Sequence, residues 1–181
     1  MPNRRAFLQG GLCVLSLPWP VWSATHGANL RFIVDGQCFD ARAFADAGRV
    51  ECAGITDPAA LFQQFERSSA SVTTWFGLTG DAQHFVLREL ATPLGYRLTY
   101  RGTHDYRSGH LIHSLNGGAE VARTARALAE AGTAWARTLI DSSSPLACVN
   151  SGPAESARVA TAVTRPADSP AYLVSWCLRR A

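Results

Sequence analysis

Three apolar segments, each followed by a segment with helical spacing, constrain the fold of this chain most strongly. The expected strands and the helices that follow them are 30–35 and 40–47, 50–55 and 59–67, and 71–78 and 81–94. Strands that alternate with helices are typical of a parallel sheet with right-handed crossovers. We therefore expect an α/β fold with a three-layer, mostly parallel sheet that begins with three strand–helix units.

A β-hairpin is expected to extend this sheet, because a short turn separates the strand-like residues 96–104 and 110–116. The hairpin contains His104, His110 and His113, so a metal site is one interpretation. Residues three apart in a strand point to opposite faces, so His110 and His113 do not share an ion. If residue 104 pairs with residue 109, His104 and His113 lie about 13 Å apart along the strands. We therefore expect no metal site.

Three arginines of the expected hairpin, Arg97, Arg101 and Arg107, have odd numbers. Because alternate residues of a strand share a face, they predict one cationic face. Such a face can meet an acidic partner or a carboxylate ligand, and the alternative is a solvated surface.

The second half of the chain is expected to contain a long helix and a final strand. The segment 119–140 is rich in alanine, and Gly132 is a natural position for a kink. Residues 172–178 predict a final edge strand, which we expect to pair with residues 159–164. Since no internal repeat is visible, residues 25–181 are predicted to form a single domain.

All 17 basic residues are arginines. The absence of lysine excludes Schiff-base chemistry, a pyridoxal-phosphate lysine and a phosphate-binding P-loop. No GxGxxG motif follows the first expected strand, which disfavours a dinucleotide, and we expect no cofactor. The formal net charge is only +3, so nucleic acid is not expected as a partner.

The first 24 residues have the pattern of an export signal. Asn3-Arg4-Arg5-Ala6-Phe7-Leu8-Gln9 matches the twin-arginine motif, and a short apolar run, residues 10–17, follows it. This run is too short to cross a bilayer, which takes about 20 apolar residues. The alternative is an ordinary basic N-terminus before an amphipathic helix. We expect cleavage near Ala24 and a periplasmic mature chain without a transmembrane anchor.

Four cysteines lie beyond the expected signal peptide, namely Cys38, Cys52, Cys148 and Cys177. An even number in an oxidising compartment is compatible with two disulfides, and buried thiols are the alternative. Among the pairings we favour Cys148–Cys177, which joins a loop to the last expected strand. Closing that loop would stabilise the fold by about 3–4 kcal/mol.

The carboxyl ends of the expected parallel strands are the place where ligands usually bind. The candidate catalytic residues there are Asp35, Asp57, Asp81 and His84. Carboxylates and an imidazole at one site would suit general acid–base chemistry. Thr79 and Gly80 form a candidate anion site, because the N–H groups at a helix start attract negative charge. The alternative is that Asp57 and Asp81 only cap helices.

Four short motifs stand out beyond the signal peptide. They are Ala53-Gly54-Ile55-Thr56-Asp57, Trp75-Phe76-Gly77-Leu78-Thr79, Arg101 with His104, and His113-Ser114-Leu115 with Gly117. Together they resemble a group of short proteobacterial proteins with twin-arginine signal peptides. That group has no assigned activity, so the resemblance implies an exported single-domain protein and assigns no catalytic residue.

Two hypotheses for the function follow from these observations. The first is an exported accessory protein that binds a partner, an oxidoreductase among those considered, or a small ligand, because nucleophile motifs are absent. The alternative is a small hydrolase-like enzyme that uses the crevice at the strand ends. A metal or redox carrier is a third hypothesis.

Overall fold

The computed structural model describes residues 30–48, 58–68, 70–141 and 154–180. The expected signal peptide, the expected strand 50–55 and Asp57 lie outside these ranges. In chain order the elements are β1 (Leu30–Val34), α1 (Phe39–Gly48), α2 (Pro58–Ser68), β2 (Thr74–Thr79), α3 (Asp81–Ala91), η2 (Thr92–Leu94), β3 (Tyr96–Arg107), β4 (His110–Gly117), α4 (Val121–Ala131), η3 (Gly132–Ala134), α5 (Trp135–Asp141), β5 (Glu155–Ala162) and β6 (Tyr172–Arg180).

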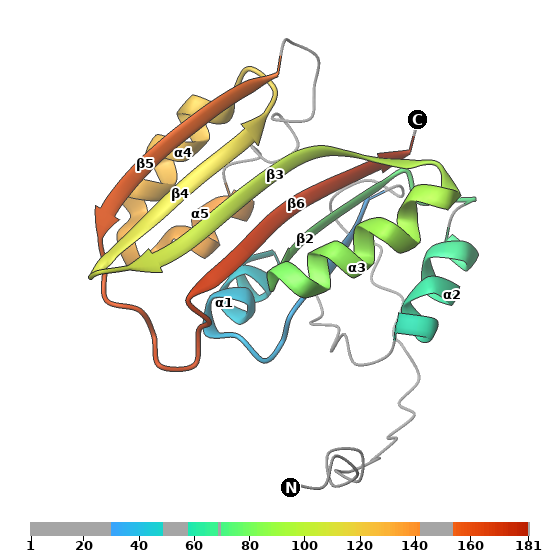
Figure 1. Cartoon of the computed structure of the whole chain (residues 1–181), viewed down its shortest axis with the longest axis horizontal. Coiled ribbons are helices and arrows are strands. Elements are labelled where there is room, and N and C mark those ends of the chain that lie inside the picture. Colours follow the sequence, from blue (N-terminus) through green and yellow to red (C-terminus); the bar gives the residue numbers. More distant parts are fainter. Residues whose placement is uncertain (1–29, 49–57, 69, 142–153, 181) are drawn as a thin grey trace, which may run out of the picture.

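The six strands form one sheet in the order β1-β2-β6-β3-β4-β5 (Figure 1). Among these described strands only β1 and β2 pair in parallel, and every other neighbouring pair is antiparallel. The fold is therefore mixed α/β, as expected, but the prediction of a mostly parallel sheet is wrong. A strand from the end of the chain enters the sheet beside β2 and reverses the strand direction there.

That strand, β6, lies inside the sheet between β2 and β3. Residues 173–178 are all buried, so side chains on both faces of β6 are covered. A continuous apolar run is typical of such an interior strand. The prediction that this strand is an edge strand paired with residues 159–164 is therefore wrong, because β5 pairs with β4 and forms the edge itself.

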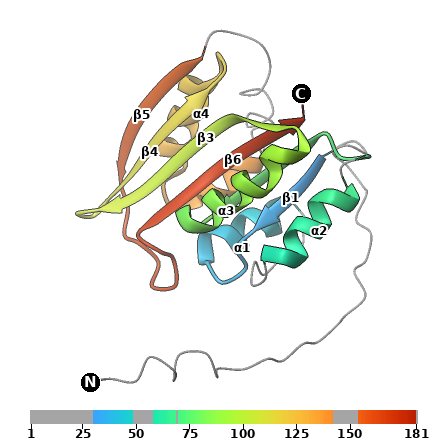
Figure 2. The same cartoon turned by 45° about the vertical axis from the view of Figure 1, so that its right-hand side comes forward.

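Alternate residues of the strands face two separate hydrophobic cores. On the first face, Phe76 of β2 stacks on Phe44 of α1 with ring centroids 5.8 Å apart. On the second face, Trp75 packs against Phe65 of α2 at 4.6 Å. Helices α4 and α5 lie behind the sheet in Figure 1 and α3 lies in front of β2 and β6, with α2 beside it in Figure 2.

The two faces are not covered to the same extent. Helices α1, α4 and α5 line the first face from β1 to β5, whereas α3 packs on β6 and the nearby part of β3. Within the described part of the chain, no helix lies over the second face of β4 and β5 (Figure 1). The predicted three-layer arrangement is therefore clear only on the β1-β2-β6 side of the sheet.

The ends of the helices explain several of the predicted boundaries. The side chain of Gln83 accepts a hydrogen bond from the N–H of Gly80 at 2.9 Å, which closes the first turn of α3. After α3 the chain leaves the helix at Gly95, which has the left-handed φ of 85°. The predicted kink in the long helix is confirmed at Gly132, whose φ of 54° separates α4 from α5.

The predicted hairpin is confirmed, but its turn is tighter than expected. Arg107 pairs with His110, so the turn consists of Ser108 and Gly109 alone. Both residues have positive φ, 52° and 75° respectively, as a type I′ turn requires. The tighter turn moves the register of the hairpin, and with it the position of every side chain on β4 relative to β3.

A bulge in β3, between Leu98 and Tyr100, reverses the alternation of its side chains. Tyr96 belongs to the core of the second face, and Tyr100 belongs to the core of the first. Arg97 therefore lies on the first face, whereas Arg101 and Arg107 share the second, so the predicted cationic face keeps two of its three arginines. Arg101 lies on the second face, next to the part of the sheet that α3 covers.

Candidate functional site

The predicted residues at the strand ends lie at one edge of the sheet, because β1 and β2 run in parallel. Asp35 follows β1, and its N–H donates to the carbonyl of Leu78 at 3.2 Å, beside the end of β2. Thr79, Gly80 and Asp81 follow directly and lead into α3. This edge, with His84 on the first turns of α3, is called the strand-end site below. Asp57, the remaining predicted residue, lies outside the described residues, so the strand-end site is described without it.

Most polar groups of the strand-end site bind other groups of the protein. The Asp35 carboxylate accepts a hydrogen bond from the N–H of Gln37 at 3.0 Å, which forms a local turn. Thr79 is buried, and its hydroxyl accepts a hydrogen bond from the Trp176 indole at 3.0 Å. The N–H of Gly80 donates to Gln83. The Thr79 hydroxyl and the Gly80 N–H of the candidate anion site are thus hydrogen-bonded to groups of the chain itself.

Asp81 is the exposed member of the strand-end site. Its carboxylate forms an ion pair with Arg101 of β3 at 3.4 Å, with side-chain exposures of 61% and 36%. An ion pair this exposed contributes little to stability. Because β6 separates β2 from β3, the sequence spacing gave no indication that these two residues meet.

His84 lies under α3 and is only 4% exposed. Its ring centroid is 6.2 Å from that of Trp176, and its Nε2 has no hydrogen-bond partner among the described residues. Burial, together with the positive charges of Arg101 and Arg88, lowers the pKa of His84 to about 4, and the negative charge of Asp81 opposes this shift. The imidazole is therefore neutral near pH 7, and Nε2 is shielded from any substrate in solution.

The structure corrects the predicted separation of His104 and His113. The two residues face each other across the hairpin, and their Nδ1 atoms are 2.7 Å apart. The distance of about 13 Å expected from the sequence assumed a longer turn. Both side chains are fully buried on the first face. No third residue completes a metal site with them in the described part of the chain.

This pair belongs to a buried polar group that we call the histidine cluster: His104, His113, Ser175, Tyr100 and Trp135. His104 Nε2 is 2.8 Å from Ser175 Oγ, which is 3.0 Å from the Tyr100 hydroxyl. The Trp135 ring covers both imidazoles, with centroids 4.2 and 5.3 Å away. Burial lowers the pKa of His104 well below its ordinary value and that of His113 to about 4, so both are neutral near pH 7.

A second buried network connects the histidine cluster to α1. The Trp135 indole donates to the Tyr106 hydroxyl at 3.0 Å, and this hydroxyl donates to the Asp40 carboxylate at 3.0 Å. The backbone N–H of Asp40 donates to Ser169 Oγ at 3.3 Å. Burial raises the pKa of Asp40 in spite of these hydrogen bonds. The network fixes the segment before β6 to the start of α1, which is a structural role.

The cysteines give no support to the disulfide prediction within the described residues. These residues contain Cys38 and Cys177, both buried, and no disulfide is found among them. Cys52 and Cys148 lie outside, so the favoured pair Cys148–Cys177 remains a prediction. Cys38 Sγ lies 3.6 Å from Ser169 Oγ, and burial raises the pKa of its thiol.

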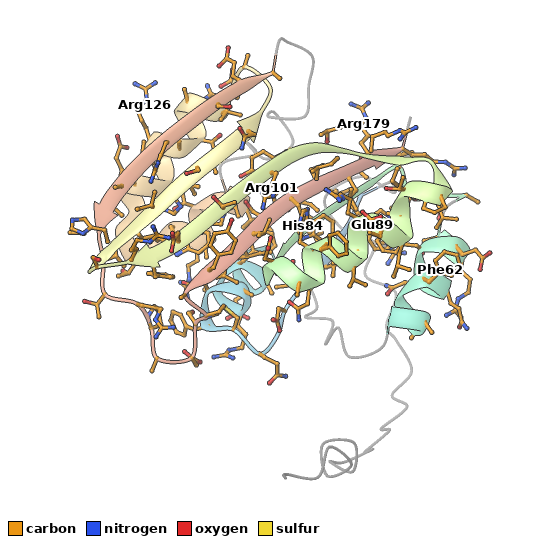
Figure 3. The ribbon with its side chains drawn as sticks, viewed as in Figure 1. Phe62, His84, Glu89, Arg101, Arg126 and Arg179 are labelled. Carbon is orange, nitrogen blue, oxygen red and sulfur yellow. The ribbon has the colours of Figure 1, made fainter. Side chains whose placement is uncertain are left out.

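The second face of β4, β5 and the adjoining part of β3, which no described helix covers, lies next to the strand-end site. We call this surface the open sheet face; it consists of Arg101, Thr103, Asp105, Ile112, Ser114, Asn116, Ser156, Arg158 and Ala160. These residues are half-buried or exposed, and they alternate with the buried residues of the first face. Figure 3 shows Arg101 at the border between this face and His84.

Polar side chains form rows across the open sheet face. Thr103 pairs with Ser114, and Ser114 pairs with Arg158, so these three side chains lie in one row. In the next row Ser156 donates a hydrogen bond of 2.6 Å to Asn116. Arg158 has no ion-pair partner among the described residues. The face is thus largely polar, and Arg158 lies near its outer edge.

No family model matches the chain, and no curated protein and no solved structure is similar to it. In the described ranges, no helix has both the length and the apolar character needed to span a membrane.

Proposed function

We propose that this protein is an exported accessory protein that binds a protein partner through the open sheet face. The twin-arginine motif at Arg4-Arg5 supports export to the periplasm, and the mature chain would begin near residue 25. The twin-arginine route carries folded proteins, so a partner that travels with this chain, an oxidoreductase for example, fits the same proposal.

The uncovered half of the sheet is the observation that carries the proposal. Helices bury the first face along its whole width, whereas the second face is buried only on the β1-β2-β6 side. The polar row Thr103–Ser114–Arg158 lies on the part of the sheet that no described helix covers. A largely polar face with hydroxyl, amide and guanidinium groups is suited to hydrogen bonds with another protein.

The hydrolase-like alternative receives less support from the same structure. Acid–base catalysis needs at least two titratable groups within reach of one substrate. The carboxylate of Asp35 holds a turn, the carboxylate of Asp81 pairs with Arg101, and His84 Nε2 is buried. These side chains serve local structure, and Thr79 and Gly80 do the same.

Affinity purification of the exported form, followed by mass spectrometry, tests the proposal. We expect one partner to co-purify with the wild type, and Arg158→Glu to reduce its yield by about tenfold or more. Arg137→Glu, an exposed arginine on α5, is the matched control and should leave the yield unchanged. The proposal is wrong if the protein emerges alone, or if both charge reversals have the same effect.

Export is tested separately, with the two arginines of the motif. Arg4→Lys combined with Arg5→Lys preserves the charge but removes the twin-arginine pattern. We expect the double variant to remain in the cytoplasm at full length, whereas the wild type reaches the periplasm in a shorter form. Equal distribution of the two proteins would contradict the export part of the proposal.

A further inference from the structure

The outermost strand of the open sheet face, β5, has a backbone edge that no other described strand pairs with. Its register with β4 runs without a shift from His110↔Ala162 to Gly117↔Glu155. In an antiparallel pair, the backbone groups of alternate residues point toward the partner strand, and those of the residues between them point away. The register therefore tells which groups of β5 face outwards.

One hydrogen bond and the β4–β5 register together show which backbone groups of β5 point outwards. The N–H of Val163 donates to the carbonyl of Gly109 at 3.1 Å, which makes this a hydrogen-bonded pair. Counting back in steps of two, Thr161 and Val159 also bond to β4, as do Ala157 and Glu155. The outward N–H and C=O groups are thus those of Ser156, Arg158, Ala160 and Ala162.

This edge lacks most of the features that usually protect an edge strand, and its two charged residues are Glu155 and Arg158. Proteins block exposed edges with proline, bulges, lysine or very short strands. Strand β5 is 8 residues long and contains no proline, lysine or bulge. The opposite edge strand, β1, has only 5 residues.

The edge is also held rigidly in place. Helix α4 packs against β5, and Ala157 and Val159 contact the core of the first face. A rigid strand loses little conformational entropy when another strand pairs with it. The edge of β5 is therefore prepared for strand addition, a known mode of peptide recognition.

The charges around the edge indicate which kind of segment fits. Arg158 on the open sheet face and Arg126 on α4 lie on the two sides of β5, and Figure 3 shows Arg126 projecting outwards there. Neither has an ion-pair partner among the described residues, whereas Arg123 is paired with Glu120 at 2.8 Å. Glu155, at the first position of the strand, is the acidic residue of β5.

We propose that β5 accepts an extended, acidic segment of a partner protein as an additional strand of the sheet. The proposal rests on the proposed function, because it names the partner's chemistry at the open sheet face. Backbone hydrogen bonds to the four outward residues would provide the affinity, and Arg158 and Arg126 would select carboxylate side chains.

Hydrogen exchange on the 15N-labelled full chain tests this directly. The probes are two peptides as long as β5, one of alternating glutamate and valine and one of alternating lysine and valine. We expect the glutamate peptide to slow exchange at the N–H groups of Arg158 and Ala160 by about tenfold or more. The N–H groups of Val159 and Thr161, already bonded to β4, serve as the internal reference. The lysine peptide should have no effect.

Two substitutions at one position separate backbone pairing from loss of the fold. Ala160→Pro removes an outward N–H without breaking a bond to β4, and it should abolish the protection. Ala160→Thr keeps that N–H and should retain the protection by the glutamate peptide. Arg158→Glu should transfer the protection from the glutamate peptide to the lysine peptide. A thermal melt confirms that each variant is folded.

The possible results distinguish this proposal from the proposed function. Strand addition is overturned if neither peptide protects β5 while the Arg158→Glu variant still loses its partner, and the proposed function then stands. It is also overturned if the outward N–H groups are already protected without peptide. Protection that rises with protein concentration would identify a second copy of the chain at the edge, and protection independent of concentration would identify a segment of the chain itself.

Discussion

The Nδ1 atoms of His104 and His113 lie 2.7 Å apart in the core, so the contact between them holds a single proton. His104 Nε2 faces Ser175, whereas His113 Nε2 has no partner among the described residues. A buried N–H without an acceptor is less tolerable than a lone pair without a donor. We therefore infer that His113 carries its proton on Nδ1 and donates it to His104, which donates from Nε2 to Ser175.

This assignment predicts two different tautomers in one pair. The 15N chemical shifts of the imidazoles near pH 7 should show a protonated Nδ1 in His113 and a protonated Nε2 in His104. Two rings with the same tautomer would contradict the assignment. Ser175→Ala leaves His104 Nε2 without its partner and should lower the free energy of unfolding by about 1–3 kcal/mol.

Acid should destabilise the fold through its buried histidines. His84 has a folded-state pKa of about 4, whereas an unfolded histidine titrates near its ordinary value of 6.5. Below 6.5 the unfolded chain binds a proton that the folded chain does not, so stability is complete above this pH and is lost as the pH falls toward 4. Between pH 7 and pH 5 the loss is about 2 kcal/mol for one such histidine.

Asp40 has a raised pKa, so its protonation in acid favours the folded state and opposes the effect of His84. Comparing variants with the wild type at the same pH separates the contribution of His84 from that of Asp40. His84→Leu should reduce the difference in unfolding free energy between pH 7 and pH 5 by about 2 kcal/mol. His110→Gln, which alters an exposed histidine, is the control. An unchanged pH dependence in the His84 variant would show that the folded protein protonates this ring.

Gly77 of β2 should not tolerate replacement by any residue that has a side chain. A Cβ there would clash with the Trp176 ring and lie 2.6 Å from the carbonyl oxygen of Ile33. Gly77→Ala should therefore lower the unfolding free energy by about 3 kcal/mol. At Gly80 the nearest atom is the flexible end of Gln83, 3.2 Å away, so Gly80→Ala should cost much less. Equal losses in urea denaturation would contradict this packing.

The hairpin turn offers a stabilising substitution. Ser108 has a positive φ of 52°, which asparagine tolerates better than serine, and Asn-Gly is the preferred type I′ sequence. Ser108→Asn should raise the unfolding free energy by about 0.5–1 kcal/mol, visible as a higher Tm. A lower Tm would mean that the turn differs from the one described.

The sequence predicted the local elements better than their arrangement. The helical spacing at α1 and α3, the hairpin and the kink at Gly132 are local features, and each is present. The position of β6 depends on contacts between residues 67 or more apart in the chain, from Asp105 with Tyr172 upwards. No spacing in the sequence contains that information.

The candidate site shows the same limit. Proximity of Asp35 to the start of α3 follows from one parallel pair of strands, and the prediction placed both at one edge. The pairing of Asp81 with Arg101, by contrast, required β6 to lie between β2 and β3 and a bulge to turn Arg101 to the second face. The register of the histidine pair depended on a serine with positive φ, which is uncommon and hard to predict.

Site-specific photo-crosslinking in exporting cells is the most direct test of the open sheet face as a partner surface. A photoreactive amino acid at Ser114 lies in the middle of this face, and one at Arg137 lies on the exposed side of α5. We expect one discrete crosslinked product from position 114 and none from position 137. A product from position 137 alone, or none from either position, would contradict the proposed partner surface.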